Sequence, residues 1–426
     1  MALRIAQPGG VRNGLYRFWL ISPSLQGRER FAMTTISHQA PIDYLAVADE
    51  LVDTFSLTAV ERDIKGGTAK AERDLIRRSG LLALLVPKSF GGCGDTWLTV
   101  LEIVRRFARV DSSIAHLFGY HFLNLVTPHM YGTEEQKRRY YMETANKPLF
   151  WGNAFNPLDQ RLVAVREGDR YYLSGTKRFC SGATDSDLLL VSAKHEEGNG
   201  PLIAVIPTRR EGVNVLNDWD NMGQRQTDSG GIEFSRVPVE LGEVLDTPGP
   251  VGTEFSKLRS SISQIILTHV YLGIAEGAFE QAKLYTASSA RAWPASGVSS
   301  AAQDPYFLRH YGDMWVRLEA ARVLVERAAR DFQSAWEKEW GLTERERGEC
   351  MMSIATAKVM TTQVGLDITS RMFEVMGSRA TSSEYRYDRF WRNLRTHTLH
   401  DPVEYKLKEL GNWALNGQFP QSSSFF

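Results

Sequence analysis

The sequence predicts an α+β protein that is mostly α, with an N-terminal helical domain, a middle antiparallel β-barrel and a C-terminal four-helix bundle. Apolar residues recur with a period near 3.6 at both ends of the chain, as on amphipathic helices. Between them, short runs of aromatic and β-branched residues alternate with turns, as in an antiparallel sheet. We place the helical domain at 38–149, the barrel at 150–248 and the bundle at 249–426, after an extension at 1–37.

The composition is that of an ordinary globular protein, and it argues against a nucleic-acid-binding protein and against a membrane protein. The chain has 426 residues, 43% hydrophobic and 23% charged, which suits two or three domains with ample core. Fifty basic and fifty acidic residues give no net charge, so nothing points to nucleic acid or an anionic membrane as partner. No apolar run approaches the roughly 20 residues that span a bilayer. Three widely spaced cysteines indicate a reducing compartment, and we expect a cytoplasmic protein.

The first residues differ from the rest of the chain. Residues 1–32 hold five Arg and one Glu, and Arg17 interrupts their apolar patch at 15–21, which argues against a secretory signal. We expect 1–37 to be a disordered extension, or to precede a true start at Met33. An Arg-rich transit peptide is the alternative.

The N-terminal domain carries clear helix signals. One apolar stripe begins near Leu45, and another runs through 96–108. Thr133 and Gln136 form a capping box before a further helix. The Pro and Gly residues of 79–94 predict a loop, and its glycines are no dinucleotide fingerprint because no strand–turn–helix unit surrounds them.

The middle domain shows short strands separated by turns that contain Gly. The strands are expected at 162–165, 171–173, 188–191, 202–206, 213–215 and 231–234. Long helices follow, with start signals at Asp304-Pro305 and at Thr343 to Glu346, and a stop at Gly377.

A helix junction near the C-terminus is the first candidate site. We expect one helix to end around 396–399 and another to begin at Pro402, with Asp401 as its N-cap and Glu404 as the capping-box acid. His397, His400 and Asp401 are then three ionisable groups at one junction. A facial triad for non-haem iron is an alternative, but these spacings across a junction fit it poorly, and we expect no metal.

Five further motifs carry a family resemblance. They are His116-Leu-Phe-Gly-Tyr-His121, Gly175-Thr-Lys-Arg-Phe-Cys-Ser-Gly182, Gly223-Gln-Arg-Gln-Thr-Asp-Ser-Gly230, Val270-Tyr-Leu-Gly-Ile-Ala275 and the stretch from Arg389 to Pro402. In this order and spacing the chain resembles the acyl-CoA dehydrogenase superfamily and, within it, the dibenzothiophene monooxygenase group, over about 46–420. That group consists of two-component flavin monooxygenases supplied with reduced FMN by a separate reductase. The resemblance implies the acyl-CoA dehydrogenase fold and a homotetramer. The flavin would lie between barrel and bundle, with a neighbouring subunit helping to hold it.

The resemblance also implies roles for particular residues. Asn153 and Ser181, placed just after strands, would meet the flavin ring or the oxygen adduct. Tyr120 would donate a hydrogen bond near the peroxide, and His116, four residues earlier on the same helix face, would line the substrate pocket. Phe179 and Trp219 would flank the ring or fill the barrel, either being open. Arg291 and Arg379 would clamp the phosphate.

One departure from the family decides between its activities. Acyl-CoA dehydrogenases typically carry a Tyr-Glu-Gly-Thr-like motif where this chain has Leu399-His-Asp-Pro402, and many draw their catalytic Glu from it. The missing acid argues against α,β-dehydrogenation. We expect His400 to hydrogen-bond the flavin hydroperoxide or take a proton, Asp401 to lie beside the cofactor, and His397 to be second shell or pocket lining. Glu374, beside a diphosphate position, favours FMN over FAD.

The sequence therefore predicts an FMNH2-dependent monooxygenase. It would transfer one oxygen from a flavin C4a-hydroperoxide to a soft heteroatom, and we expect this atom to be the sulfur of an aromatic or alkyl sulfur compound. No NAD(P)H-binding βαβ unit is evident, so an NAD(P)H:flavin reductase is the expected partner alongside O2. The alternatives are an FAD-dependent acyl-CoA dehydrogenase-like oxidoreductase, an N-hydroxylase or indole oxygenase on this scaffold, and a non-catalytic helical scaffold.

Overall fold

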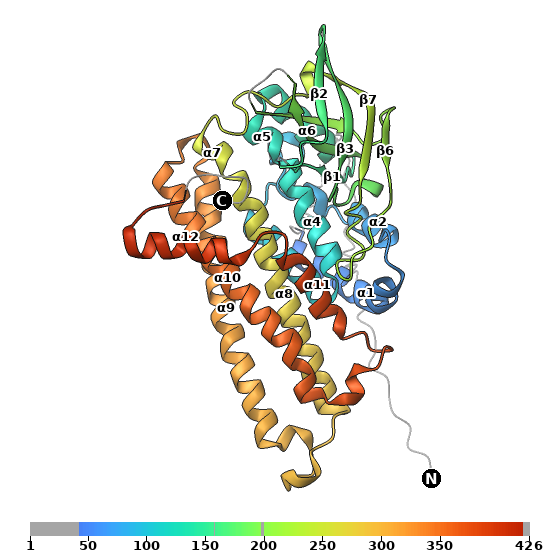
Figure 1. The fold of residues 1–426 in the computed structure, drawn as a ribbon, viewed down its shortest axis with the longest axis vertical. Helices are drawn as coiled ribbons and strands as arrows, with labels where there is room; N and C mark the ends of the chain where they lie inside the picture. Colours follow the sequence, from blue (N-terminus) through green and yellow to red (C-terminus); the bar gives the residue numbers. More distant parts are fainter. Residues whose placement is uncertain (1–41, 157, 197–199, 421–426) are drawn as a thin grey trace, which may run out of the picture. The chain divides into compact units, whose positions relative to one another are not determined.

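The computed structural model describes residues 42–156, 158–196 and 200–420. Nearly all of them belong to one compact unit, Asp43–Phe426. The predicted extension at 1–37 lies outside the described residues. The expected fold class is confirmed: helices precede and follow a seven-stranded sheet (Figure 1).

Helices precede the sheet. They are α1 Tyr44–Lys65, α2 Lys70–Arg78, α3 Trp97–Val110, α4 Ser112–Leu125, α5 Thr127–Tyr131 and α6 Glu134–Asn146. The capping box of Thr133 and Gln136 is present, and the Asp111 side chain caps α4 by accepting from the backbone N–H of Ile114. The loop between α2 and α3 contains only two short 3-10 turns, Leu81–Ala83 and Lys88–Phe90, as its proline and glycines predict.

The sheet is mixed rather than purely antiparallel. Its strands are β1 Trp151–Ala154, β2 Val163–Glu167, β3 Arg170–Lys177, β4 Leu188–His195, β5 Pro201–Pro207, β6 Val213–Val215 and β7 Ile232–Glu240. The order is β1-β4-β2-β3-β7-β6, with β5 pairing β4. β4 pairs in parallel with β1 and with β2, while the other pairings are antiparallel. The sequence did not predict β1, because its four residues are all buried and show no alternation.

The C-terminal part is helical. Its helices are α7 Glu254–Lys257, α8 Arg259–Ser288, α9 Pro305–Glu337, α10 Glu344–Met376, α11 Asp388–Thr398 and α12 Val403–Asn416, and the three longest are α8, α9 and α10. The start signals at Asp304 and Thr343 and the stop at Gly377 are confirmed as caps. Short 3-10 turns at Ala183–Asp185, Leu241–Glu243, Pro294–Ser296, Ala301–Gln303, Glu339–Gly341 and Ser378–Thr381 complete the described elements.

Helix α8 lies at the centre of the helical core. It contacts α3, α4, α9, α10 and α11, so α4 is held between α8 and strand β1 (Figure 1). The stretch Glu254–Ser288 is long and apolar enough to cross a membrane by length and composition, which the sequence reading overlooked. However, 94% of its most apolar window is buried inside the protein, as in a core helix.

The predicted helix junction is present, but its capping is different. α11 ends at Thr398 and α12 begins at Val403, close to the expected positions. Pro402 is the N-cap residue, and α12 has no side-chain cap, so the predicted roles of Asp401 as N-cap and Glu404 as capping-box acid are wrong. The Asp401 carboxylate instead pairs with Lys358 of α10 and with Lys406 of α12.

Candidate active site

Helix α4 carries two of the predicted site residues on one buried face. His116 and Tyr120 stand four residues apart, and their ring centroids are 4.0 Å from each other. All residues of α4 are buried, because the helix is covered by α3, α8 and β1. The prediction that the two rings share a face is confirmed.

His116 also contacts the C-terminal junction. The Nε2 atom of His397 on α11 lies 3.0 Å from Nδ1 of His116. Burial, together with the charge of His400, lowers the pKa of His116 to about 3, and burial lowers the pKa of His397 well below its ordinary value. Both imidazoles are therefore neutral near pH 7, so one ring nitrogen donates and the other accepts. The hydroxyl of Tyr271 on α8 donates to the backbone oxygen of His397 at 2.8 Å and fixes the end of α11.

Asp401 is the centre of a buried charge cluster. Its Oδ1 accepts from Lys358 Nζ at 2.6 Å and from His400 Nδ1 at 3.0 Å, and its Oδ2 lies 3.5 Å from Lys406 Nζ. Burial alone would raise the pKa of Asp401, but the hydrogen bond from His400 and the charges of the two lysines hold it well below its usual value. Burial lowers the pKa of Lys406 to about 7. The carboxylate is therefore ionised and already committed to three partners.

The hydroxyl of Tyr120 is buried and has no hydrogen-bond partner among the described residues. Burial raises the pKa of Tyr120, the charge of Asp401 raises it further, and the charge of Arg259 opposes both. The phenol therefore stays protonated and can donate. His397 Nδ1 and Gln264 Nε2 are likewise buried without a partner within the described part of the chain. Such atoms are costly in a folded protein and mark places where a ligand or water completes the structure.

Asn153 and Ser181 lie together on the sheet side of α4. The backbone N–H of Asn153 donates to the backbone oxygen of Ser181 at 3.0 Å, and the Ser181 hydroxyl is 2.8 Å from that of Ser229. Asn153 lies inside β1 rather than after a strand, whereas Ser181 follows β3 as expected. Asn124 on α4 donates to the backbone oxygen of Gly152 at 3.2 Å, which joins this strand to the helix that carries Tyr120.

Phe179 and Trp219 form a separate aromatic pair. Their ring centroids are 6.1 Å apart in an edge-to-face arrangement. Phe179 has a positive φ of 60° and is 62% exposed, so it does not fill the barrel core. Of the two interpretations left open, core filling is therefore wrong for Phe179. A role of the pair beside a bound ligand stays a prediction.

Arg291 and Arg379 lie at the far end of the bundle. Both are exposed, and Arg379 Nη2 donates to the backbone oxygen of Ser289 at 2.5 Å, just beyond the end of α8. Tyr271, whose hydroxyl contacts His397, lies on α8 as well. At about 1.5 Å of rise per residue, it is roughly 27 Å along the helix from Ser289. One FMN cannot span that length, so within one chain the structure does not bring these arginines to the other predicted residues.

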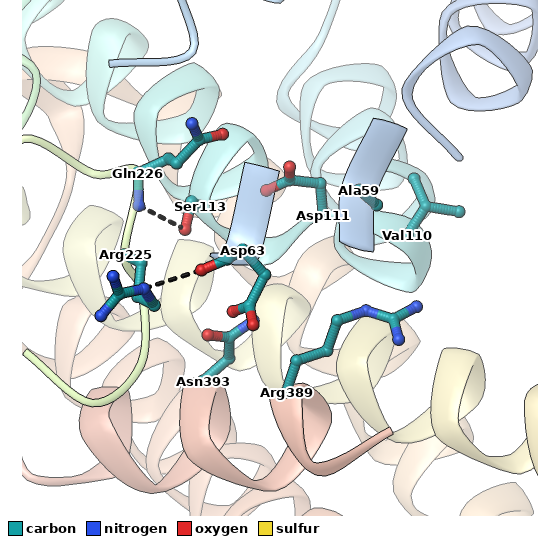
Figure 2. A pocket seen from close by; sticks show the side chains of 9 residues that line it. All are labelled: Ala59, Asp63, Val110, Asp111, Ser113, Arg225, Gln226, Arg389 and Asn393. Carbon is teal, nitrogen blue, oxygen red and sulfur yellow. Dashed lines mark hydrogen bonds between the residues drawn. The ribbon is translucent and has the colours of Figure 1, made fainter. Parts of the chain in front are cut away.

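A small polar pocket lies one helical turn from the histidine pair. Ser113 precedes His116 on α4 and Asn393 precedes His397 on α11, and both face this pocket in Figure 2. The full lining is Ala59, Asp63, Val110, Asp111, Ser113, Arg225, Gln226, Arg389 and Asn393.

The charges at this pocket are largely paired. Asp63 accepts from Arg392 Nη2 at 2.6 Å, Asp111 accepts from Arg62, and Arg225 Nε donates to the backbone oxygen of Asp63 at 2.7 Å. We interpret the pocket as part of the ionic network that fixes α1 against α11, below the histidine pair.

Sequence reasoning missed several residues of the site. Arg259, Gln264 and Tyr271 on α8, with Lys358 on α10, all contact or flank the predicted group. Lys358 could have been noticed as a lone charge within an apolar helical stretch. No three His, Cys, Asp or Glu side chains in the described ranges are placed to hold a metal ion.

Family models match most of the chain in the order of this architecture. They are the N-terminal domain of acyl-CoA dehydrogenase at residues 48–147, its middle domain at 155–237 and its C-terminal domain at 265–405. These matches agree with the fold that the sequence predicted.

Individual relatives narrow the family. The probable FMNH2-dependent monooxygenase SfnC of Pseudomonas putida is 53% identical over 90% of this chain and 98% of its own length. The structure of methanesulfinate monooxygenase MsuC from Pseudomonas fluorescens has a TM-score of 0.89 and 52% identity, covering 90% of this chain and 100% of that one. The dibenzothiophene monooxygenase TdsC of Paenibacillus sp. A11-2, solved with FMN and indole, has a TM-score of 0.87 and 44% identity over 90% of this chain and 99% of its own. The chain belongs to the acyl-CoA dehydrogenase family and, within it, to the FMNH2-dependent monooxygenases.

Proposed function

We propose that this protein transfers one oxygen atom from O2 to the sulfur of a small organosulfur compound, using reduced FMN that a separate NAD(P)H:flavin reductase supplies in the cytoplasm. The observation that carries the proposal is a group of buried polar atoms that have no hydrogen-bond partner among residues 42–156, 158–196 and 200–420: the Tyr120 hydroxyl, His397 Nδ1 and Gln264 Nε2. They come from three helices around one neutral histidine pair. A ligand with several hydrogen-bonding heteroatoms would satisfy them.

The residues present fit FMN. Asn153 and Ser181 offer amide and hydroxyl groups on the sheet side of α4, and Tyr120, His400 and Gln264 offer donors on the helical side. FMN, when reduced and bound, supplies the electrons that activate O2. Buried apolar neighbours such as Phe118 and Phe122 on α4 help to keep water from this region.

The side chains have separable roles in this proposal. Tyr120 remains protonated and donates from its hydroxyl to an oxygen atom brought against it. The Asp401 carboxylate accepts from His400 Nδ1 and orients the imidazole, so that His400 can hold or accept a proton at Nε2. His116 and His397, both neutral, add no charge that would attract water or stray protons.

The state of Asp401 argues against the dehydrogenase alternative. An acyl-CoA dehydrogenase requires a carboxylate that is free to take a proton from carbon. Here the only acid of the junction is paired with Lys358 and Lys406, and its pKa is held below the ordinary value, so it is a weak base.

The phosphate clamp requires a second copy of the chain. Arg291 and Arg379 are too far from Tyr120 to reach the same FMN within one protomer, yet both are exposed, and Arg379 contacts the backbone of Ser289, two residues before Arg291. In a homotetramer, the arginines of one subunit would grip the phosphate of an FMN whose ring lies against the Tyr120 cluster of another. This arrangement explains why side chains predicted for one site lie at opposite ends of α8.

The function is tested with purified protein, FMN, NADH and a generic flavin reductase. A panel of sulfides, sulfones, sulfinates, amines and indole is incubated under 18O2, and the products are analysed by mass spectrometry. We expect one 18O atom in the product of at least one sulfur compound. The proposal fails if no sulfur compound is oxygenated, or if the protein binds FAD tightly and FMN not at all. Anaerobic reduction of bound FAD by an acyl-CoA would support the dehydrogenase alternative instead.

A further inference from the structure

Arg259, the first residue of α8, is a buried guanidinium whose contacts are all neutral. The side chain is 7% exposed. Its Nε donates to the Thr127 hydroxyl at 2.8 Å, its Nη2 lies 3.5 Å from the Asn124 side-chain oxygen, and its guanidinium carbon is 3.9 Å from the centroid of the Phe155 ring. No carboxylate of the described residues forms an ion pair with it.

Three of the other buried arginines form ion pairs, and the fourth, Arg389, donates to backbone oxygens and has the charges of Asp63 and Asp111 acting on it. Arg62 pairs with Glu72, Arg73 with Asp185 and Arg347 with Glu254. Burial lowers the pKa of Arg259, and the groups that oppose this effect are the hydroxyls of Tyr131 and Tyr120 rather than any acid. A buried charge without a counter-ion is destabilising, and stacking on an aromatic ring does not neutralise it. Such a residue is typical of a site that receives an anion.

The position of Arg259 links it to the proposed site. Asn124, whose side-chain oxygen lies near Arg259 Nη2, stands one helical turn beyond Tyr120 on α4. The hydroxyl of Tyr120, which has no partner among the described residues, is close enough to Arg259 for the charge of the guanidinium to affect its pKa. Phe155, which lies under the guanidinium, donates its backbone N–H to the Asn153 side-chain oxygen at 3.3 Å. Arg259 therefore lies between the Tyr120 side of the site and strand β1.

We propose that Arg259 binds the two oxygens of an alkanesulfinate, R–SO2−, and thereby selects small sulfur oxoanions as substrates of the monooxygenase proposed above. A guanidinium donates two parallel N–H bonds to two oxygens on one atom, which leaves the sulfur lone pair uncovered for oxygenation. The relatives of this chain are named for both an anionic sulfinate and neutral aromatic compounds, so similarity alone does not decide between these classes. The unpaired charge favours the anion.

The reaction balances without a further reagent. The sulfinate, O2 and FMNH2 give the sulfonate R–SO3−, water and FMN. One S–O bond forms and the O–O bond breaks. The sulfur loses two electrons and FMNH2 two, and O2 gains four. The second oxygen atom leaves as water with the two hydrogens of FMNH2.

Methanesulfinate binding can be measured without oxygenation, so this inference can be tested separately from the proposed function. Calorimetry with sodium methanesulfinate is carried out on the protein with oxidised FMN, for the wild type, Arg259→Gln, Arg259→Lys and the control Arg139→Gln, an exposed arginine paired with Glu143 at 3.0 Å. We expect Arg259→Gln to weaken methanesulfinate binding at least 100-fold, Arg259→Lys to weaken it less, and Arg139→Gln to leave it unchanged. The neutral isostere dimethyl sulfoxide should bind no better to the wild type than to Arg259→Gln.

Two further measurements exclude other reasons for a loss of methanesulfinate affinity in Arg259→Gln. FMN affinity, read from flavin fluorescence, should change less than about threefold in Arg259→Gln. The Tm of the ligand-free variant should not fall, because the substitution removes an unpaired buried charge. Unchanged methanesulfinate affinity would overturn the inference, and so would an equal loss of FMN affinity, which would assign Arg259 to the flavin. Arg259-dependent binding in a protein that oxygenates no sulfur compound would contradict the proposed function and leave the anion site standing.

Discussion

Asp401→Asn should destabilise the protein strongly, although it changes only one atom. The substitution removes the counter-charge of Lys358 and Lys406, whose side chains are 2% and 3% exposed. At an effective dielectric constant of 20, charges 2.6 Å apart, as for Lys358 and Asp401, attract by about 6 kcal/mol. Desolvation offsets part of this attraction, and breaking a buried pair typically costs about 3–5 kcal/mol. We therefore expect a loss of about 3–5 kcal/mol in the free energy of unfolding.

Equilibrium unfolding in urea at pH 6, below the pKa of about 7 of Lys406, measures this loss. Lys358→Met should cost less than Asp401→Asn, because Lys406 remains 3.5 Å from the carboxylate. The double variant Asp401→Asn/Lys358→Met should be more stable than Asp401→Asn alone, since one unpaired ammonium is gone. Arg139→Gln, which breaks an exposed pair, should cost at most about 1 kcal/mol. A loss below about 1 kcal/mol for Asp401→Asn would refute the reading of Asp401 as the centre of a buried charge cluster.

Three further outcomes are expected. His400→Ala should retain FMN binding but lose product and release more hydrogen peroxide per NADH consumed; full yield without extra peroxide would rule out its role. The pKa of His116 is about 3 in the folded protein and about 6.5 in the unfolded chain, so the unfolded state takes up the proton first as the pH falls. From pH 7 to pH 5 this group should therefore remove about 2 kcal/mol of stability, and urea unfolding of His116→Asn should show a correspondingly flatter pH dependence. Arg379→Gln and His400→Ala should each be inactive alone, whereas mixed oligomers should recover activity if the phosphate clamp belongs to a neighbouring subunit; no recovery would contradict the shared site.

The sequence predicted what is locally determined. The capping box predicted at Thr133 and the start signal predicted at Thr343 act over three residues, and the structure has a capping box at both. The apolar period of the long helices is similarly local, and so is the shared face of His116 and Tyr120. Strand β1 was missed because it is buried on both faces, so that its pattern has no alternation to read.

The sequence could not predict contacts that depend on tertiary packing. Asp401 looked like an N-cap because it precedes a proline, but Lys358, 43 positions away, binds its carboxylate instead. The His116–His397 contact joins residues 281 positions apart. Arg259 had no local signal, since its significance lies in the lack of an ion pair with any acid of the described residues. Long-range charge pairing, rather than local propensity, decides these roles.

The same charge pairing accounts for the chemistry of the site. The junction acid is bound by two lysines, so it orients His400 instead of acting as a base. The histidine pair is neutral, so it leaves Tyr120 as the protonated donor of the cluster. Arg259 remains as a nearby positive charge that no carboxylate in the described part of the chain pairs with. We propose that a fold shared with dehydrogenases can thus serve oxygen transfer to an anionic sulfur compound, because the junction acid Asp401 is neutralised, whereas Arg259 forms no ion pair within the described ranges.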